Sequence, residues 1–302
     1  MNLQRNYMTK TQKNKILVAV DFSEQSAIAL GQSYNLAKGI GAGLTLLYVI
    51  EDRGALFKFF SKKQSEEIKK NIQKELDKLA AEVEKKTKLK VETMIAKGAP
   101  YEKITEIAEM IGATFIIMGK NGTETIKKKF LGSNSLKVVR ESKVPVITIR
   151  GKRHRDGCAN IVLPLDLTKE TKEKVSKAIW LAKLYQGASI RVVSVLFTTD
   201  EFVVNRLTRQ MGQVRAFIEA TGIECTAEII KGIKGEETLA QNIIDYSKKV
   251  EGDLIMIMTQ QEVDFTPYFI GSAAQEVINS SEIPVMSIIP VPKKDTTVSV
   301  LS

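Results

Sequence analysis

The stretch FIIMGKNGTETIKKKFLGSNSLKVVRESKVPV, residues 115–146, decides how the rest of the chain is interpreted. Its apolar run ends at Gly119, two further glycines follow at Gly122 and Gly132, and a helical pattern begins directly after them. Glycines between a strand and a helix let backbone amides approach a phosphate group with no Cβ in the way. The stretch therefore predicts a strand, a phosphate-binding turn and a helix, in that order.

The composition describes a globular chain with enough apolar residues for two hydrophobic cores. The 302 residues exceed the roughly 100–200 of a typical domain, and 43% of them are hydrophobic. The formal charge is +10, but the lysines are dispersed among glutamates and no aromatic-basic platform accompanies them. We therefore expect solvated charged faces and no nucleic-acid partner.

Few residues suit a metal centre or a nucleophile paired with histidine. Two distant cysteines, Cys158 and Cys225, and a single histidine, His154, are present, the histidine inside a Gly/Lys/Arg-rich segment. A Ser-His-Asp triad, a zinc site and a disulfide framework each need residues that this pattern lacks. We predict reduced structural thiols, no protein metal site and no catalytic residue.

The chain also lacks the sequence signals of membrane insertion. No apolar run approaches the roughly 18 residues that a membrane span needs. The first 12 residues are polar and lack the apolar core of a secretory signal. We therefore predict a cytoplasmic protein that does not associate with a membrane.

Apolar runs alternate with helical patterns along the first half. The run KILVAVDFS ends at Asp21 and Ser23, which predicts a buried strand and then a helix with Ser23 as its N-cap. Further strands are predicted at residues 44–50, 91–96, 114–118 and 144–149, with amphipathic helices between them.

The same pattern begins again in the second half. IVLPLDLT at 161–168 matches ILVAVDFS at 16–23, and IPVMSI at 283–288 matches VPVITI at 144–149. FIIM at 115–118 resembles IMIM at 255–258. Such self-similarity indicates two copies of one α/β unit in tandem.

Strands that alternate with helices predict an α/β fold with two tandem Rossmann-like domains. Each domain is expected to hold a five-stranded parallel sheet of order 3-2-1-4-5 with helices on both faces. The ligand crevice then lies between the first and fourth strands, which end at Asp21 and Gly119. The predicted boundaries are a leader at 1–12, a first domain at 13–150, a linker at 151–158, a second domain at 159–291 and a tail at 292–302.

These residues resemble the universal stress protein family. The resemblance is carried by VDFS at 20–23, LLYVI at 46–50, GAPYEKITEIAE from Gly98 and VPV at 144–146. Its most specific part is the family's nucleotide motif of Gly, two residues, Gly, nine residues and Gly-Ser. That motif stands without a gap at Gly119, Gly122, Gly132 and Ser133. Both halves take part, so the chain resembles a tandem member.

The resemblance implies that ATP, with Mg²⁺ as a candidate companion ion, lies across the C-terminal edge of the first sheet. Asp21 and the backbone of Val49 would contact the adenosine end. The ribose and phosphates would be held by Gly119, Gly122, Gly132, Ser133 and Asn134. Each residue alone has a structural interpretation, such as a helix cap or a tight turn, and their joint spacing favours binding. Lys120, beside the motif, either screens phosphate or is an ordinary solvated lysine.

The resemblance further implies that the two domains pair through their fifth strands, at 144–149 and 283–288. Such pairing would cover sheet edges that are otherwise exposed. Association of two chains into a homodimer is left open.

The second copy departs from the nucleotide motif. Aligning FIIM with IMIM places Thr259 and Glu262 at the first two glycines, with a shorter spacer to Gly271 and Ser272. A carboxylate repels phosphate and a Cβ blocks close backbone approach, so no ATP is expected there. Because the second copy is expected to fold without these glycines, the alignment also suggests that the fold does not need them. A different ligand beside Met256, Met258 and Phe265 is the third alternative, but ordinary core is the interpretation we favour.

The leading functional hypothesis is an ATP-binding stress-response or signalling protein whose conformation or partner binding depends on nucleotide. A nucleotide-independent interaction or chaperone-like protein is the alternative. No general base or activated nucleophile is recognisable, so we expect no enzyme beyond a slow ATPase.

Overall fold

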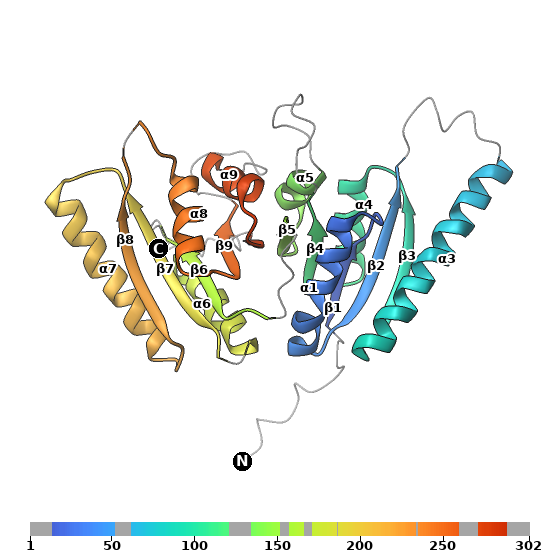
Figure 1. Cartoon of the computed structure of the whole chain (residues 1–302), viewed down its shortest axis with the longest axis horizontal. Coiled ribbons are helices and arrows are strands. Elements are labelled where there is room, and N and C mark those ends of the chain that lie inside the picture. Colours follow the sequence, from blue (N-terminus) through green and yellow to red (C-terminus); the bar gives the residue numbers. More distant parts are fainter. Residues whose placement is uncertain are drawn as a thin grey trace, which may run out of the picture.

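The computed structural model describes residues 14–51, 62–120, 134–151, 157–165, 171–185, 187–233, 235–259 and 271–288. They form an α/β fold in which ten strands share one mostly parallel sheet (Figure 1). None of the described helices combines the length and apolar character needed to cross a bilayer.

The first half contains nine described elements. In chain order they are β1 (Lys15–Ala19), α1 (Glu24–Ile40), β2 (Gly43–Ile50), α3 (Lys62–Thr87), β3 (Val91–Lys97), α4 (Pro100–Met110), β4 (Phe115–Gly119), α5 (Asn134–Glu141) and β5 (Val146–Ile149). The predicted strands are all present, although β4 begins one residue and β5 two residues later than the apolar runs suggested.

The second half repeats this order. Its elements are β6 (Asn160–Pro164), α6 (Thr171–Leu184), β7 (Ser189–Leu196), α7 (Glu201–Glu219), β8 (Cys225–Lys231), α8 (Leu239–Lys249), β9 (Leu254–Met258), α9 (Ser272–Ser280) and β10 (Val285–Ile288). The strand order across the sheet is β3-β2-β1-β4-β5-β10-β9-β6-β7-β8, so each half has the predicted order 3-2-1-4-5. The predicted fold class is confirmed.

The two halves meet at β5 and β10, the one antiparallel pair among the described strands. Val285 pairs with Thr148, and Ser287 pairs with Val146. In Figure 1 these strands lie at the centre, while α3 and α7 flank the outer ends of the sheet.

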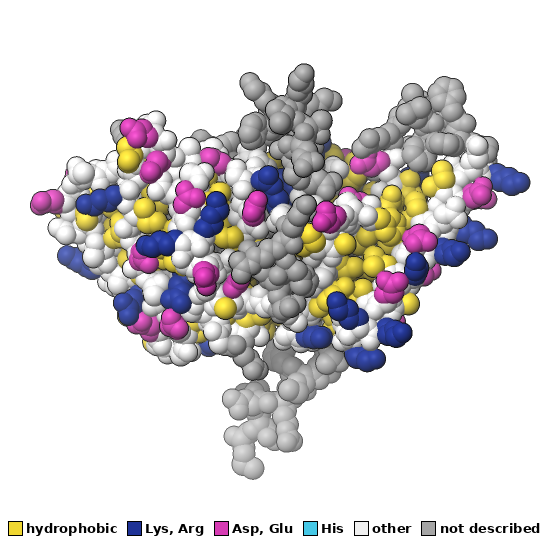
Figure 2. Space-filling view, in the orientation of Figure 1, with side chains coloured by type: hydrophobic (Ala, Val, Ile, Leu, Met, Phe, Trp, Pro, Cys, Tyr) yellow, Lys and Arg dark blue, Asp and Glu magenta, His cyan; other side chains and the backbone are white. Residues whose placement is uncertain are grey.

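Apolar side chains bury both faces of the sheet. On one face α1, α3, α6 and α7 pack on alternate strand residues such as Ile16 and Val18, and on the other α4, α5, α8 and α9 pack on their neighbours such as Leu17. Each cluster contains residues from both halves. Figure 2 shows a hydrophobic area between α1 and α3, where Tyr48, Ile72 and Ile95 are only partly buried.

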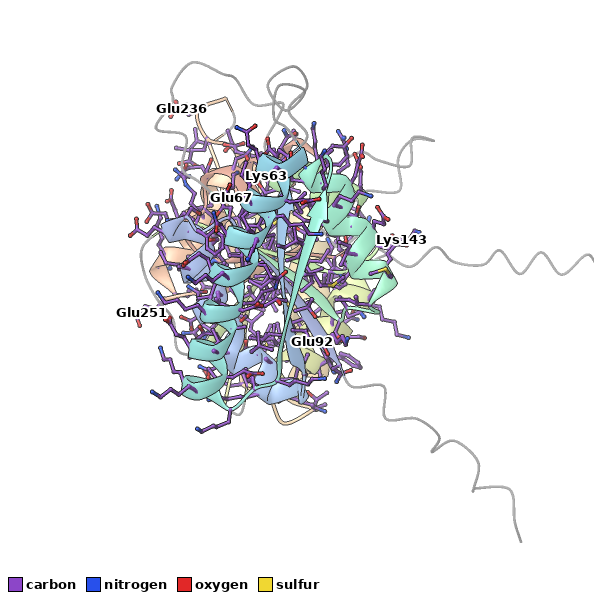
Figure 3. All side chains as sticks on the ribbon, turned by 90° about the vertical axis from the view of Figure 1, so that its right-hand side faces the viewer. Lys63, Glu67, Glu92, Lys143, Glu236 and Glu251 are labelled. Atoms are coloured by element: carbon purple, nitrogen blue, oxygen red, sulfur yellow. The ribbon has the colours of Figure 1, made fainter. Side chains whose placement is uncertain are left out.

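Charged residues cover the outer edge at α3 and β3. Glu92 on β3 pairs with Lys15 at 2.9 Å and with Lys90 at 3.0 Å. Figure 3 looks onto this edge and shows Glu92 beside α3, whose Lys63 and Glu67 are exposed. Edge strands protected by charge are poor templates for pairing with other chains.

The pairing register of the fourth and fifth strands in each half corrects the sequence alignment of the two copies. Gly119 pairs with Ile149 in the first half, and Met258 pairs with Ile288 in the second. Since 144–149 and 283–288 correspond, the counterpart of Gly119 is Met258, and the alignment that placed Thr259 there is wrong by one residue. Every residue of LIMIM is apolar, so the letters alone did not fix the register.

The corrected offset of 139 residues, from Gly119 to Met258, also changes the rest of the motif. It matches Gly122 with Gln261, not Glu262, and Gly132 with Gly271, so the spacer is not shortened. The second copy still lacks the first two glycines of the motif.

Candidate functional site

The order of β1 and β4 in the sheet creates a crevice where the connections change direction. β1 lies between β2 and β4; the chain after β1 forms α1 on one face of the sheet, and the chain after β4 forms α5 on the other face. A crevice of about 240 Å³ opens there. Its lining includes Ala19, Val20, Asp21, Ser26, Leu47, Val49, Glu51, Pro100, Ile104, Met118, Gly119, Lys120, Asn134 and Ser135.

Four of the seven residues predicted from sequence lie around this crevice. They are Asp21 after β1, Val49 in β2, Gly119 at the end of β4 and Asn134 at the start of α5. The other three, Gly122, Gly132 and Ser133, lie outside the described residues. Strand ends that are distant in sequence therefore converge as an open parallel sheet requires.

Asp21 is anchored by the first turn of the following segment. Its Oδ1 accepts hydrogen bonds from the Ser23 amide at 3.0 Å and the Ser23 hydroxyl at 2.5 Å. Partial burial by itself raises the pKa of Asp21, but hydrogen bonds from Ser23 and Ser26 outweigh it and lower the pKa below 3.8. The carboxylate is thus ionised at neutral pH.

Ser23, and not Asp21, caps helix α1. The Ser23 hydroxyl oxygen accepts from the Ser26 amide at 3.2 Å, and Ser23 has extended backbone angles. The predicted N-cap is therefore present, and Asp21 acts on the cap by fixing the position of Ser23. This arrangement leaves Asp21 at the crevice while α1 begins behind it.

The backbone of Val49 extends past the end of β1. The Val20 amide donates to the Leu47 carbonyl at 2.9 Å, which is the last described bond from the β1 segment to β2. Backbone groups alternate in direction along a strand, so those of Val49 point to the same side as those of Leu47. One amide and one carbonyl of β2 therefore face the crevice beyond the reach of β1.

Gly119 permits close packing between β4 and α1. A Cβ on Gly119 would lie 2.5 Å from the backbone carbon and oxygen of Gln25. The glycine therefore has a structural role in this half, which corrects the suggestion that the fold does not need it. The same close approach brings the end of β4 beside the start of α1.

The Lys120 side chain is neither a solvated loop lysine nor directed at a phosphate, the two alternatives that the sequence offered. It is only 7% exposed, and its Nζ donates to the Ile278 carbonyl at 3.2 Å and to Asn279 Oδ1. Burial, together with the nearby charge of Arg150, lowers its pKa from 10.5 to about 8. Lys120 thus links the end of β4 to the C-terminal end of α9 in the other half.

The sequence did not single out Glu51, Pro100 or Ile104, which also line the crevice. Glu51 directly follows β2, and Pro100 opens α4, so both occupy the carboxyl edge of the sheet. Treating every strand end of the predicted sheet as a possible lining position would have found them.

The thiols and acidic residues show no second centre of chemistry in the described part of the chain. Cys158 and Cys225 both carry a thiol and not a disulfide, and burial raises the pKa of Cys225 to about 11. Within the described ranges, His, Cys, Asp and Glu form no cluster of three or more that could hold a metal ion. His154 lies outside those ranges.

The fold and crevice define a tandem α/β protein with a crevice at the switch point of its first half. The sequence profile of the universal stress protein family matches residues 13–150 and again 158–288. The chain belongs to the universal stress protein family and carries two of its domains.

Individual relatives align with about half of this chain. Universal stress protein YxiE of Bacillus subtilis is 32% identical over 146 residues, covering 45% of this chain and 99% of that protein. Universal stress protein MJ0577 of Methanocaldococcus jannaschii is 31% identical over 162 residues, covering 46% of this chain and 95% of that protein. Each relative therefore corresponds to about half of this chain.

A solved structure resembles the whole tandem arrangement. A universal stress protein from Archaeoglobus fulgidus superposes with a TM-score of 0.75 at 23% identity, covering 92% of this chain and 97% of that one. At this identity the likeness concerns the fold.

Proposed function

We propose that the first half binds ATP, and that nucleotide occupancy biases conformation or partner binding in stress response or signalling. The observation that carries this proposal is the convergence of Asp21, Val49, Gly119 and Asn134 on one crevice at the topological switch point. The intact spacing of Gly119, Gly122, Gly132 and Ser133 supports the same ligand class.

The adenosine end suits the residues of β1 and β2. The ionised carboxylate of Asp21 accepts hydrogen bonds from ribose hydroxyls or contributes to holding Mg²⁺. The Val49 amide and carbonyl, which extend beyond β1, offer the donor and acceptor that an adenine edge requires. Both groups belong to rigid strand ends, so they need little ordering when a ligand arrives.

The phosphate end suits the glycines and the start of α5. Gly119, Gly122 and Gly132 lack Cβ atoms. Asn134 begins α5, whose N-terminus favours an anion, and Ser133 precedes it in the sequence. Lys120 also lines the crevice, but its Nζ donates to the Ile278 carbonyl and to Asn279, so we assign it no hydrogen bond to phosphate.

The test is thermal or denaturant unfolding with and without ATP and magnesium. A binder at a hundredfold excess over its dissociation constant gains about 2.7 kcal/mol of stability. We expect this gain in the native chain and its loss in Gly122→Gln, which introduces the residue that the second copy carries at the matching position. Equal stability of the native chain with and without saturating nucleotide would favour a nucleotide-independent interaction protein.

We also propose a cytoplasmic location, the division of the chain at residues 151–158, and pairing of its two domains through β5 and β10. The antiparallel register of Val285 with Thr148 supports the pairing. A size measurement in solution would then separate a single chain from a homodimer.

A further inference from the structure

The second half has its own crevice at the carboxyl edge of the sheet. It measures about 370 Å³, against about 240 Å³ for the first. Residues from the ends of β6, β7 and β9 form its floor, and α7, α8 and α9 form its sides. Figure 1 shows α7 and α8 flanking these strands. A volume of about 300–1,000 Å³ is usual for small-molecule sites.

The lining of this crevice is mostly aliphatic. Met258 stands at the position of Gly119 and Ala273 at that of Asn134, so the residues matched to a phosphate site are apolar. Val195, Leu207, Ile243 and Ile257 continue the apolar lining. The interpretation of Met258 as ordinary core is therefore incomplete, because it is 8% exposed and lines the crevice.

Apolar side chains also stand exposed at the rim. Phe202 is 76% exposed and Val203 is 38% exposed, both in the first turn of α7. Leu239, at the start of α8, is 37% exposed. Apolar residues gathered around a concave site mark a place where apolar surface is buried on binding.

The charge of the lining is positive. Lys174 and Arg206 belong to it, and its described members include no aspartate or glutamate, whereas the first crevice has Asp21 and Glu51. Lys174 already interacts with a neighbour, so the charge argument rests on Arg206. Arg206 is exposed, makes no ion pair with the described residues, and lies one turn beyond Phe202 on α7.

We propose that the second crevice binds an aliphatic carboxylate of medium chain length. The chain occupies the apolar crevice, and the carboxylate pairs with Arg206 at the rim. Burial of the methylene groups supplies the main driving force. A planar guanidinium donates two parallel hydrogen bonds to a carboxylate, which fixes the orientation of the chain. The proposal does not depend on ATP binding in the first half.

The first experiment is calorimetric titration of the full chain with decanoate, 1-decanol and butanoate. We expect saturable binding of one decanoate per chain and weaker binding of decanol. Butanoate, which lacks six of the methylenes of decanoate, should bind at least about a hundredfold more weakly because it buries much less apolar surface. Equal affinity for decanoate and decanol, or uptake that does not saturate, would overturn the proposal.

Matched charge variants locate the site. Arg206→Gln should weaken decanoate binding about threefold to tenfold, as expected for an exposed pair. Arg209→Gln removes the same charge from the same helix at a position that does not line the crevice, and should leave affinity unchanged. Equal effects of the two variants would contradict a head-group role for Arg206.

A filling variant tests the apolar part. Ala274→Leu adds side-chain volume to the crevice and should abolish decanoate binding, and circular dichroism checks that the variant is folded. No decanoate binding by the native chain would overturn the proposal.

Discussion

The two crevices occupy the same place in two copies of one fold, and their linings differ in chemistry. The first is lined by Asp21, Glu51, Gly119 and Asn134. The second has Met258 and Ala273 at the positions of Gly119 and Asn134. The strands and helices that support the crevices are alike, so ligand chemistry is decided at strand ends and not in the core.

Lys120 and Thr259 make a second comparison, because both follow the fourth strand of their half. The Lys120 amide donates to Ile149 at 2.7 Å, and the Thr259 amide donates to Ile288 at 3.1 Å. The backbone at Lys120 therefore matches the backbone at Thr259. Of these two side chains, only that of Lys120 reaches the other half, where it contacts α9. The first half is thus attached to α9, the helix that lines the apolar crevice of the second half.

The largest expected effect is that of a side chain at Gly119. Gly119→Ala places a Cβ 2.5 Å from the Gln25 backbone, so unfolding free energy should fall by about 1–3 kcal/mol. Denaturant unfolding measures the change. Gly212→Ala is the control, because Gly212 lies in α7 and an added Cβ would meet open space. This variant should be more stable than the native protein because alanine favours a helix more than glycine does. Unchanged stability of Gly119→Ala would contradict the structural role of this glycine.

Loss of the Lys120 contact should have the next largest effect. Lys120→Met leaves the Ile278 carbonyl and Asn279 without their donor, which should cost about 1–2 kcal/mol at pH 7. Chemical denaturation of both proteins gives the difference. No loss would show that the contact between the halves does not contribute to stability.

The pH dependence of that difference follows from the lowered pKa. Between about 8 and 10.5 the unfolded chain binds more protons at Lys120 than the folded chain, so native stability rises with pH in this window. The native protein should therefore gain stability relative to Lys120→Met from pH 8 to 10.5. A constant difference would show that the buried amine keeps its ordinary pKa.

Most strands and helices could be predicted from the sequence because buried strands carry continuous apolar runs. The internal repeat also showed the pattern of each element twice. The strand order and the convergence of Asp21 with Gly119 followed from these elements and from the family resemblance. The one-residue register of β9 did not, since any residue of LIMIM suits a buried strand. The hydrogen bonds of the Lys120 side chain could not be predicted either, because its partners Ile278 and Asn279 are more than 150 residues away in the sequence.

The smallest expected effect concerns Asp21. Asp21→Ala removes the acceptor of two hydrogen bonds from Ser23 and should cost about 0.5–1 kcal/mol at pH 7. Because the folded pKa is lowered, this stability is present above the unfolded pKa and is lost as pH falls through the folded value. Unfolding at pH 7 and pH 2.5 should show the difference shrinking. Asp21→Asn, which retains an acceptor, is the control, and an equal loss in both variants would contradict the account.

Calorimetric titration with ATP and magnesium tests the difference between the two halves most directly. The account predicts one nucleotide bound per chain and no binding after Gly122→Gln, with the variant folded. Two nucleotides per chain, none at all, or full affinity in Gly122→Gln would contradict it.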